Sequence, residues 1–393
     1  MKRVLFTTSS EGFIDEKEVA QRENYKIGAK TDRVLLTALF ALLMLGTIMI
    51  ASASYPYASS HYGDGSYYIK RQAIFLCIGI ATMLFASNVS MSFYKKISPY
   101  FYATCAVLLV VVLFGGFSEG VAKRWLGIPG TPLSFQPSEL MKLGIILALA
   151  WYIDKKLTQE SNIVSEIVLP GVILFGACGL VLLEKHLSGT VIIALIGISV
   201  LFIGGINARK MALVYGMTAL AGGIVFLLTN SYAMKRIQSF LNPNADVLSD
   251  KWQTTQGLFA IGSGGLFGLG LGNSRQKYSY VSEPQNDFIF TIWCEETGFF
   301  GAVLVIILFL ILIWRGYIIA MRAPDTFSSL VAFGITSQIG IQSFLNMLVV
   351  TDLIPNTGIS LPFFSYGGSS LVILLAEMGI LLSISKKSRL KGG

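Results

Sequence analysis

Charged residues are scarce in this chain: Asp, Glu, Lys and Arg make up 13% of its 393 residues, whereas hydrophobic residues make up 53%. Soluble domains carry about 25% charged residues, so the composition excludes an ordinary soluble protein. The apolar residues fall in continuous runs long enough to cross a bilayer, and the short alternating segments of a β-barrel are missing. The sequence therefore predicts an all-α polytopic membrane protein.

Cysteine is also rare. The four cysteines, Cys77, Cys105, Cys178 and Cys294, lie in or beside apolar segments and lack the spacing of metal ligands. This pattern excludes a disulfide framework and indicates small core side chains. The formal charge of +8 does not require nucleic acid as a partner, because the cytoplasmic loops of membrane proteins collect Lys and Arg.

The apolar runs predict about ten transmembrane helices within a domain over residues 34–385. Their expected ranges are Val34–Ser54, Gln72–Asn88, Pro99–Phe117, Ser138–Ile153, Glu166–Leu183, Ser188–Ile206, Met211–Thr229, Asn286–Trp314, Phe327–Val350 and Tyr366–Ser385. Residues 1–33 lack the apolar stretch of a signal peptide and are predicted to be a flexible cytoplasmic tail. Residues 386–393 are predicted to be a basic cytoplasmic tail.

Most Lys and Arg residues outside one long connection, about residues 230–285, lie on one side of these spans. Because cytoplasmic loops are the positive ones, both termini are expected in the cytoplasm of a protein in the cytoplasmic membrane. The long connection, between spans seven and eight, is then external. So are the shorter segments Gly115–Pro137 and Thr351–Ser365.

Asp287 lies at the outer edge of the eighth span and is followed at once by Phe288, Ile289 and Phe290. An acid at the edge of a hydrophobic span costs free energy, so it requires either a source of solvation or a function.

Other charges gather on the external side in the segment Ala122–Lys142, AKRWLGIPGTPLSFQPSELMK. Gln136 lies near the expected start of a helix, with Glu139 in its first turn. Lys142 follows three residues later on the same helical face, so the two charges can pair. One interpretation is a capped helix with a satisfied ion pair. The other is that this pair and Arg124 hold an anionic group near the membrane surface.

A further charged turn, Glu184, Lys185 and His186, precedes the sixth span. Interfacial turns often carry anchoring charges, and that is the favoured interpretation here. A single histidine does not make a metal site.

The long external connection contains a glycine-rich stretch between Gly262 and Gly272. It is not a dinucleotide-binding motif, because no strand–turn–helix context surrounds it. The glycines would allow close backbone packing or a re-entrant loop. Arg275 and Lys277 end the stretch with positive charge on the same side as Asp287.

The ninth span carries Gln338, Gln342 and Asn346 at intervals of four residues, which predicts a polar stripe along one helical face. Such a stripe either joins helices or lines a polar groove. Glu377, within the last span, is another acid that needs a partner. Together, the external acid, cations and glycine loops fit a lipid-linked substrate that bears phosphate.

Four blocks carry a resemblance to a known family: AKRWLGIPGTPLSFQPSELMK, GLFAIGSGGLFGLGLGNSRQKY, EPQNDFIF with CEETGF, and PNTGISLPFFSYGGSS. With the ten spans, they cover nearly the whole chain beyond its tail. The sequence resembles the SEDS family of shape, elongation, division and sporulation proteins, and within it the FtsW/SpoVE branch.

This resemblance implies a peptidoglycan glycosyltransferase that polymerises lipid II at the outer leaflet, in complex with a class B penicillin-binding protein. Asp287 matches the family's essential acid and would be the general base. Arg124 and Lys142 would hold the pyrophosphate of the undecaprenyl pyrophosphate leaving group. Arg275 and Lys277 would help them, in a site surrounded by membrane lipids.

Three points stay open at this level. A divalent cation, Mg²⁺ or Mn²⁺, could bridge the pyrophosphate, although the sequence shows no ligand set for one. If Pro284 begins the helix, Asp287 lies in its first turn, where the helix dipole lowers its pKa and favours an orienting or cation-binding role over that of a base. A lipid II flippase and a non-catalytic scaffold for the penicillin-binding protein are the alternative functions.

Overall fold

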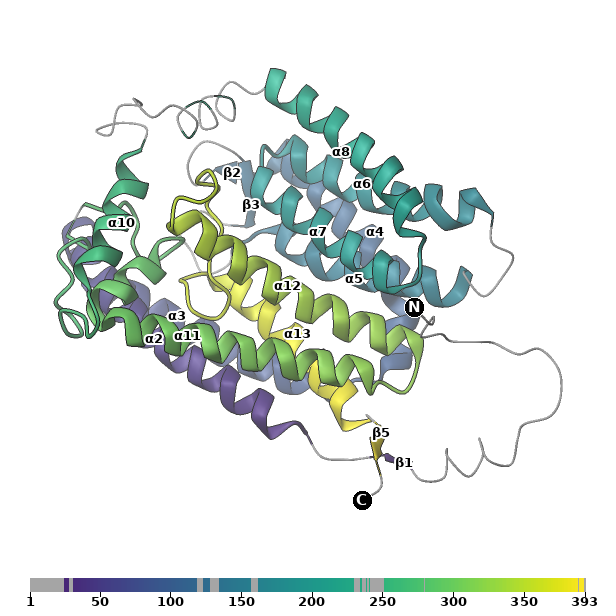
Figure 1. Ribbon diagram of the computed structural model, residues 1–393, viewed down its shortest axis with the longest axis horizontal. Coiled ribbons are helices and arrows are strands. Elements are labelled where there is room, and N and C mark those ends of the chain that lie inside the picture. The colour runs from purple at the N-terminus through teal and green to yellow at the C-terminus, as the bar shows by residue number, and fades with distance from the viewer. Residues whose placement is uncertain are drawn as a thin grey trace.

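The computed structural model of the chain describes residues 25–27, 31–118, 123–127, 134–156, 162–229, 234, 238, 240, 251–278, 280–387 and 389–391. Within these ranges, long helices cover all ten predicted spans (Figure 1). They are α2 (Arg33–Tyr62), α3 (Tyr67–Ala86), α4 (Met91–Gly115), α5 (Pro137–Lys156), α6 (Leu169–Leu183), α7 (Leu187–Ile203), α8 (Ala208–Thr229), α11 (Ile289–Met321), α12 (Thr326–Val350) and α13 (Gly368–Lys386). A π-helical turn, Val164–Val168, leads into α6.

Eight of the described helices are long and apolar enough to cross a membrane. Helix α7 has only 17 residues, and α5 carries Glu139 and Lys142 near one end and Asp154 near the other. Helix α5 tolerates these charges because other helices surround it in place of lipid. It packs against α4, α6, α7, α12 and α13 in the centre of the bundle, and every residue from 141 to 150 is buried.

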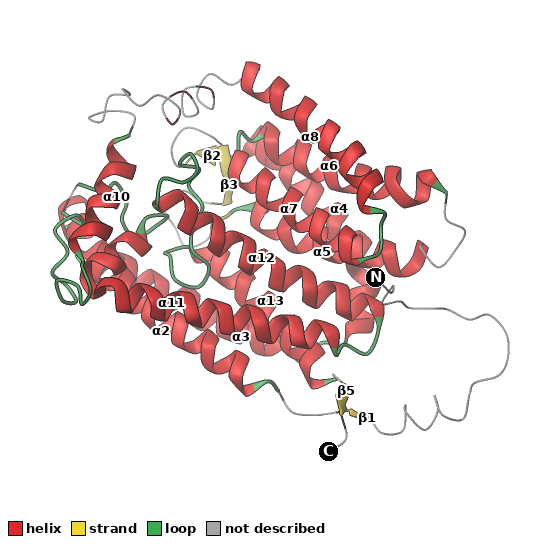
Figure 2. Ribbon diagram, in the orientation of Figure 1, coloured by secondary structure: helices red, strands yellow, loops and turns green. Residues whose placement is uncertain are grey.

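The helices form two groups that meet along α5, α7 and α12. In Figure 1, α2, α3, α11 and α13 lie on one side, and α4, α6 and α8 lie on the other. Figure 2 shows that helices make up almost all of the described fold. The all-α prediction is confirmed, and the few strands are short.

The segments predicted to be external lie toward the same end of the bundle. The first forms a small antiparallel sheet of β2 (Phe117–Ser118), β3 (Lys123–Gly127) and β4 (Ser134–Phe135). The long connection contains a helix that the sequence did not predict, α10 (Trp252–Ser263). Its Gln253 accepts a hydrogen bond from Asn356 Nδ2 at 3.2 Å, which joins it to the connection before α13.

At the opposite end, β1 (Tyr25–Ile27) pairs antiparallel with β5 (Arg389–Lys391) (Figure 1). These strands belong to the two tails that the sequence predicts to be cytoplasmic. The remainder of the N-terminal tail up to residue 30, and most of the predicted external loop between residues 230 and 250, lie outside the described residues.

Helix α11 differs from the predicted eighth span at its start. The prediction began at Asn286, but the helix begins at Ile289 with Phe288 as its N-cap. Asp287 therefore lies just before the helix and not in its first turn. The expectation that Asp287 lies within the first turn of this helix is therefore wrong.

Candidate active site

The polar stripe on α12 connects four parts of the chain, and each of its residues has a different partner. Gln338 Nε2 donates to both carboxylate oxygens of Glu377 on α13, at 3.0 and 2.9 Å. Gln342 Nε2 donates to the Ser360 carbonyl at 3.1 Å. All three stripe side chains are buried. The geometry is that of the helix-joining alternative, since none of them faces an open groove.

Asn346 fixes the backbone at Asp287. Its Nδ2 lies 2.8 Å from the Asp287 carbonyl oxygen and 2.6 Å from that of Ile359. The Asp287 side chain is only partly buried, and Gly358 faces it: a Cβ on Gly358 would lie 3.8 Å from Asp287 Oδ2. The Tyr366 N–H donates to the Gln285 carbonyl at 2.9 Å. Asp287 is thus positioned by α12 and by the connection that precedes α13.

Lys142 and Glu139 form the ion pair predicted from their spacing. Lys142 Nζ lies 2.8 Å from Glu139 Oε1, and its side chain is 3% exposed. Lys142 also donates to Gln342 Oε1 at 3.1 Å, and Ser370 Oγ donates to Glu139 Oε2 at 2.7 Å. Gln342 and Asn346 are one helical turn apart, about 5.4 Å along α12. They therefore link the Lys142 ammonium and the Asp287 backbone carbonyl to adjacent turns of that helix.

Arg124, on β3, joins this network from the side of the α6–α7 turn. Its guanidinium donates to the Lys185 carbonyl at 2.7 Å. The next residue, His186, has its Nδ1 3.2 Å from Gln136 Nε2 and 3.2 Å from Ser138 Oγ at the start of α5. Burial, aided by the nearby Arg124 charge, lowers the pKa of His186 to about 3. The ring is therefore neutral, and its Nδ1 is the acceptor for these two donors.

A groove of about 1190 Å³ lies between α6 and α8, beside this turn. Its walls are mostly apolar, with Phe175, Leu180, Met217 and Phe226 among the lining side chains, and Lys185 is the charged residue that lines it. An apolar groove that ends at a basic residue suits an amphiphile with a long hydrocarbon chain and an anionic head.

Arg275 and Lys277 precede Asp287 in the sequence and have other partners. Lys277 is 4% exposed and pairs with Glu296 Oε1 at 2.9 Å. Arg275 is exposed, and its backbone N–H donates to Glu295 Oε1 at 3.0 Å. The Lys277 ammonium is thus engaged within the protein, in contrast to the role of pyrophosphate helper that the sequence predicts for it.

Sequence reasoning did not identify Glu295 and Glu296 as functional residues. They lie in the apolar sequence IFTIWCEETGFF, and both are 1% exposed. Placing two adjacent acids in an apolar helix costs at least as much free energy as placing Asp287 at the edge of a span. The criterion that singled out Asp287 would therefore also have identified Glu295 and Glu296.

Among the described residues, no group of three or more His, Cys, Asp or Glu side chains is placed to hold a metal ion.

Glu184, beside Arg124, gives the site a pH-dependent element. It is 3% exposed, neither of its carboxyl oxygens has a hydrogen-bond partner among the described residues, and burial raises its pKa from 4.5 to about 8 against the opposing charge of Arg124. Between these pH values the folded chain keeps a proton that the unfolded chain has lost. Its contribution therefore makes the free energy of unfolding fall as the pH rises through this window.

We expect Glu184→Gln to remove that contribution. The variant should be more stable than the wild type at pH 8.5 and should lose less of its melting temperature between pH 5 and pH 8.5. Thermal unfolding in detergent at a series of pH values measures this. If the melting temperatures of the two proteins change equally with pH, burial does not raise the pKa of Glu184.

Comparison with known proteins places this geometry in context. Residues 33–390 match the family model of the cell cycle proteins FtsW, RodA and SpoVE. Stage V sporulation protein E of Bacillus subtilis (strain 168) is 42% identical over 366 residues, which are 92% of this chain and 99% of the relative. The probable peptidoglycan glycosyltransferase FtsW of Geobacter sp. (strain M18) is 38% identical over 91% of this chain and 97% of its own.

Solved structures share the fold. The first is a chain of a peptidoglycan synthase complex, from a structure that concerns the structural coordination of polymerization and crosslinking. It superposes with a TM-score of 0.74 at 25% identity, over 90% of this chain and 97% of that one. The rod shape determining protein RodA of Thermus thermophilus superposes with a TM-score of 0.68 at 28% identity, over 91% and 97%.

Proposed function

The chain belongs to the SEDS family of FtsW, RodA and SpoVE proteins and is a peptidoglycan glycosyltransferase of the cytoplasmic membrane, and we propose that it polymerises lipid II at the outer face of that membrane. The polymer would serve cell-wall synthesis in division or sporulation. The observation that carries the proposal is the placement of Asp287: Asn346 on α12 binds its backbone carbonyl, Gly358 lies against its carboxylate, and the residue is only partly buried. An accessible acid fixed at the end of a membrane bundle suits a general base that acts on a lipid-linked sugar.

In this reaction Asp287 acts as the general base. It takes the proton from the 4-hydroxyl of the acceptor sugar as that oxygen attacks the anomeric carbon of the donor. The bond from the anomeric carbon to the pyrophosphate oxygen breaks, and undecaprenyl pyrophosphate leaves with both electrons. Fixing the Asp287 backbone through Asn346 orients the carboxylate before the substrate arrives, which lowers the cost of reaching the reactive geometry.

The leaving group needs positive charge and a place for its isoprenoid chain. Arg124 supplies the charge. Lys142 is engaged by Glu139 within the protein, as Lys277 is by Glu296, and with Gln136 this pair holds α5 and the α6–α7 turn in place. The groove between α6 and α8 takes the hydrocarbon chain, and Lys185 at its edge lies next to Arg124. Arg is well suited to this role because its planar guanidinium binds phosphate oxygens in pairs.

We expect Arg124→Gln to lower kcat/KM for lipid II by about tenfold, the effect of losing roughly 1.4 kcal/mol of transition-state stabilisation, with part of the loss in kcat. The matched control is Lys123→Gln, which removes an exposed charge from the neighbouring position of β3. Initial rates of polymer formation over a range of lipid II concentrations measure both constants. Equal effects of the two substitutions would show that only general surface charge matters.

The superposed chain from a peptidoglycan synthase complex supports a class B penicillin-binding protein as the partner of this chain, with the partner crosslinking the strands that this chain makes. The test uses the purified full-length chain in liposomes with fluorescent lipid II, with and without the partner, and with the partner's transpeptidase blocked by a β-lactam. Polymer that forms under the block supports the proposal. A flippase would move lipid II across the bilayer without polymer, and a scaffold would do neither.

A further inference from the structure

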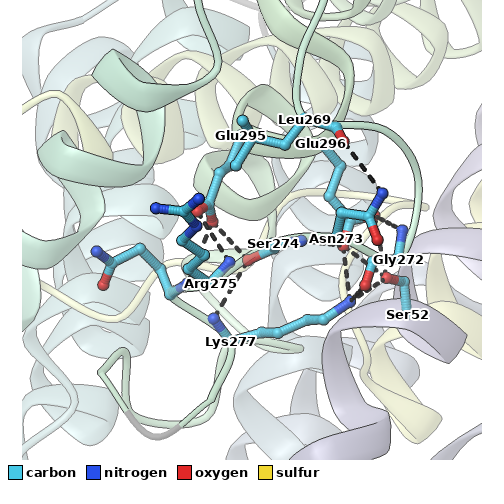
Figure 3. Close-up of polar contacts among 10 residues, drawn as sticks. Ser52, Leu269, Gly272, Asn273, Ser274, Arg275, Lys277, Glu295 and Glu296 are labelled. Carbon is cyan, nitrogen blue, oxygen red and sulfur yellow. Dashed lines mark hydrogen bonds and ion pairs between the residues drawn. The ribbon is translucent and has the colours of Figure 1, made fainter.

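The ammonium group of Lys277 is held inside the protein by oxygen atoms from three segments of the chain (Figure 3). Lys277 Nζ lies 2.9 Å from Glu296 Oε1, 2.6 Å from the Gly272 carbonyl oxygen and 3.0 Å from Ser52 Oγ. The Glu296 side chain is 0% exposed. Ser52 Oγ also donates to Glu296 Oε1 at 2.7 Å. A buried ion pair thus joins α2, α11 and the loop that leads to Asp287.

The turn before Lys277 wraps around the carboxylates of Glu295 and Glu296. Four backbone N–H groups of this turn donate to them: those of Gly272 and Ser274 to Glu296 at 2.9 and 3.4 Å, and those of Arg275 and Gln276 to Glu295 at 3.0 and 3.4 Å. Ser274 Oγ adds a fifth donor, 2.5 Å from Glu295 Oε2. Consecutive N–H groups around an anion form a nest of the kind that binds phosphate. Here the anions are side chains of the same protein.

The first turns of α11 are attached to this loop and separated from the rest of their helix. The backbone carbonyl oxygens of Glu295 and Glu296 accept hydrogen bonds from the N–H groups of Leu269 and Gly270, at 2.9 and 3.0 Å. At Gly298 the backbone leaves helical geometry, with φ 68° and ψ −163°. The segment 289–297 is therefore a separate piece of helix, and Asp287 precedes its N-cap, Phe288.

We propose that Ser52, Lys277 and Glu296 form a latch that positions Asp287 for catalysis. The inference rests on the proposed role of Asp287 as the base. The loop leaves the latch at Lys277 and returns to it at Glu296, and Asp287 lies between these two anchors. The latch holds one side of this closed loop against α2, while Asn346 holds the other side against α12. With the latch open, Gly298 lets the first turns of α11 rotate with Asp287.

The latch differs in a testable way from the pyrophosphate role that the sequence suggests for Lys277. If Lys277 bound substrate, neutralising Glu296 would release its ammonium and strengthen substrate binding. If Lys277 only closes the latch, neutralising Glu296 should harm the reaction as much as removing Lys277. Each single change leaves a buried charge without its counter-charge, whereas the double change leaves none.

The experiment compares Lys277→Met, Glu296→Gln, the double variant and Ser52→Ala in full-length protein with its partner. We expect each charge-removing single variant to lower kcat for lipid II polymerisation about 10- to 100-fold, as misplacement of a catalytic group by about 1 Å does. KM should stay within about threefold, and the double variant should be no slower than the slower single one. Ser52→Ala is the mild variant, with a smaller loss of kcat and no buried charge left behind.

Lys70→Met is the matched control, because Lys70 pairs with Asp64 at 2.8 Å on an exposed surface, and it should leave both constants unchanged. Hydrogen exchange reports the latch without activity: amides 272–278 and 280–288 should exchange faster in Lys277→Met than in the wild type, while the α13 amides keep their protection. Unchanged kcat, or a lower KM in Glu296→Gln, overturns the latch. If instead Asp287→Asn keeps full activity, the catalytic assignment fails, and a loss of kcat in the latch variants then has another cause.

Discussion

Asp287→Asn is expected to abolish polymerisation of lipid II, with a fall in rate of about 10²- to 10⁴-fold, the usual contribution of a general base. Asparagine has nearly the same size and shape as aspartate, but its amide cannot take the proton of the attacking hydroxyl. The hydrogen bond from Asn346 goes to the backbone carbonyl of residue 287, so the substitution keeps it. The variant should therefore fold and bind its partner normally. Polymer formation by the purified complex, measured with labelled lipid II, gives the rate.

The matched control for this prediction is Asp352→Asn. Asp352 is an acid in the connection that faces the same end of the bundle, and its φ of 56° is one that asparagine adopts readily. It should leave the polymerisation rate unchanged. If Asp287→Asn retains about a tenth or more of the wild-type rate, the loss falls short of what removing a general base costs. The acid would then orient the hydroxyl or bind a substrate-borne cation.

The spans could be predicted because each is an apolar run whose length is set by the bilayer. Their ends could not, since helices continue past the hydrocarbon region where hydropathy gives no signal. Helix α2 was expected to stop at Ser54 but runs to Tyr62, through Pro56 and a polar, tyrosine-rich stretch. Helix α10 was missed for a related reason. Its end borders a glycine-rich sequence, and such a sequence is typical of a loop when the segment that packs against it is unknown.

The candidate site was predicted as a set of residues but not as a network. Spacing alone showed that Glu139 and Lys142 could pair, because that contact lies within one helix. It could not show that Lys142 also meets Gln342, since the partner of a helix face depends on the packing of distant segments. Lys277 illustrates the same limit. Its charge is visible in the sequence, whereas the buried carboxylate that neutralises it lies on another element.

The glycine-rich stretch was expected either to pack closely against another backbone or to form a re-entrant loop, and Gly264 shows close packing. It ends α10 against the first turns of α11, where a Cβ would overlap the carbonyl group of Cys294 and lie 3.1 Å from the Glu295 Cα. These are backbone atoms, so no change of rotamer can relieve the overlap. Helix α10 would have to separate from the segment that follows Asp287.

Gly264→Ala is therefore expected to lower the free energy of unfolding by about 1–3 kcal/mol or more, the cost of overpacking a tight contact. It should also reduce polymerisation, because the backbone it displaces leads directly from Asp287. Gly262→Ala is the matched control two residues earlier. Its Cβ would meet nothing within 4 Å, and alanine in place of an exposed helical glycine should stabilise α10 by up to about 1 kcal/mol. Thermal unfolding of both variants in the same detergent measures the difference. Opposite effects of the two alanines would show that the close packing at Gly264 causes the loss of stability. If both variants are destabilised, the loop is intolerant of substitution in general and the packing explanation is wrong.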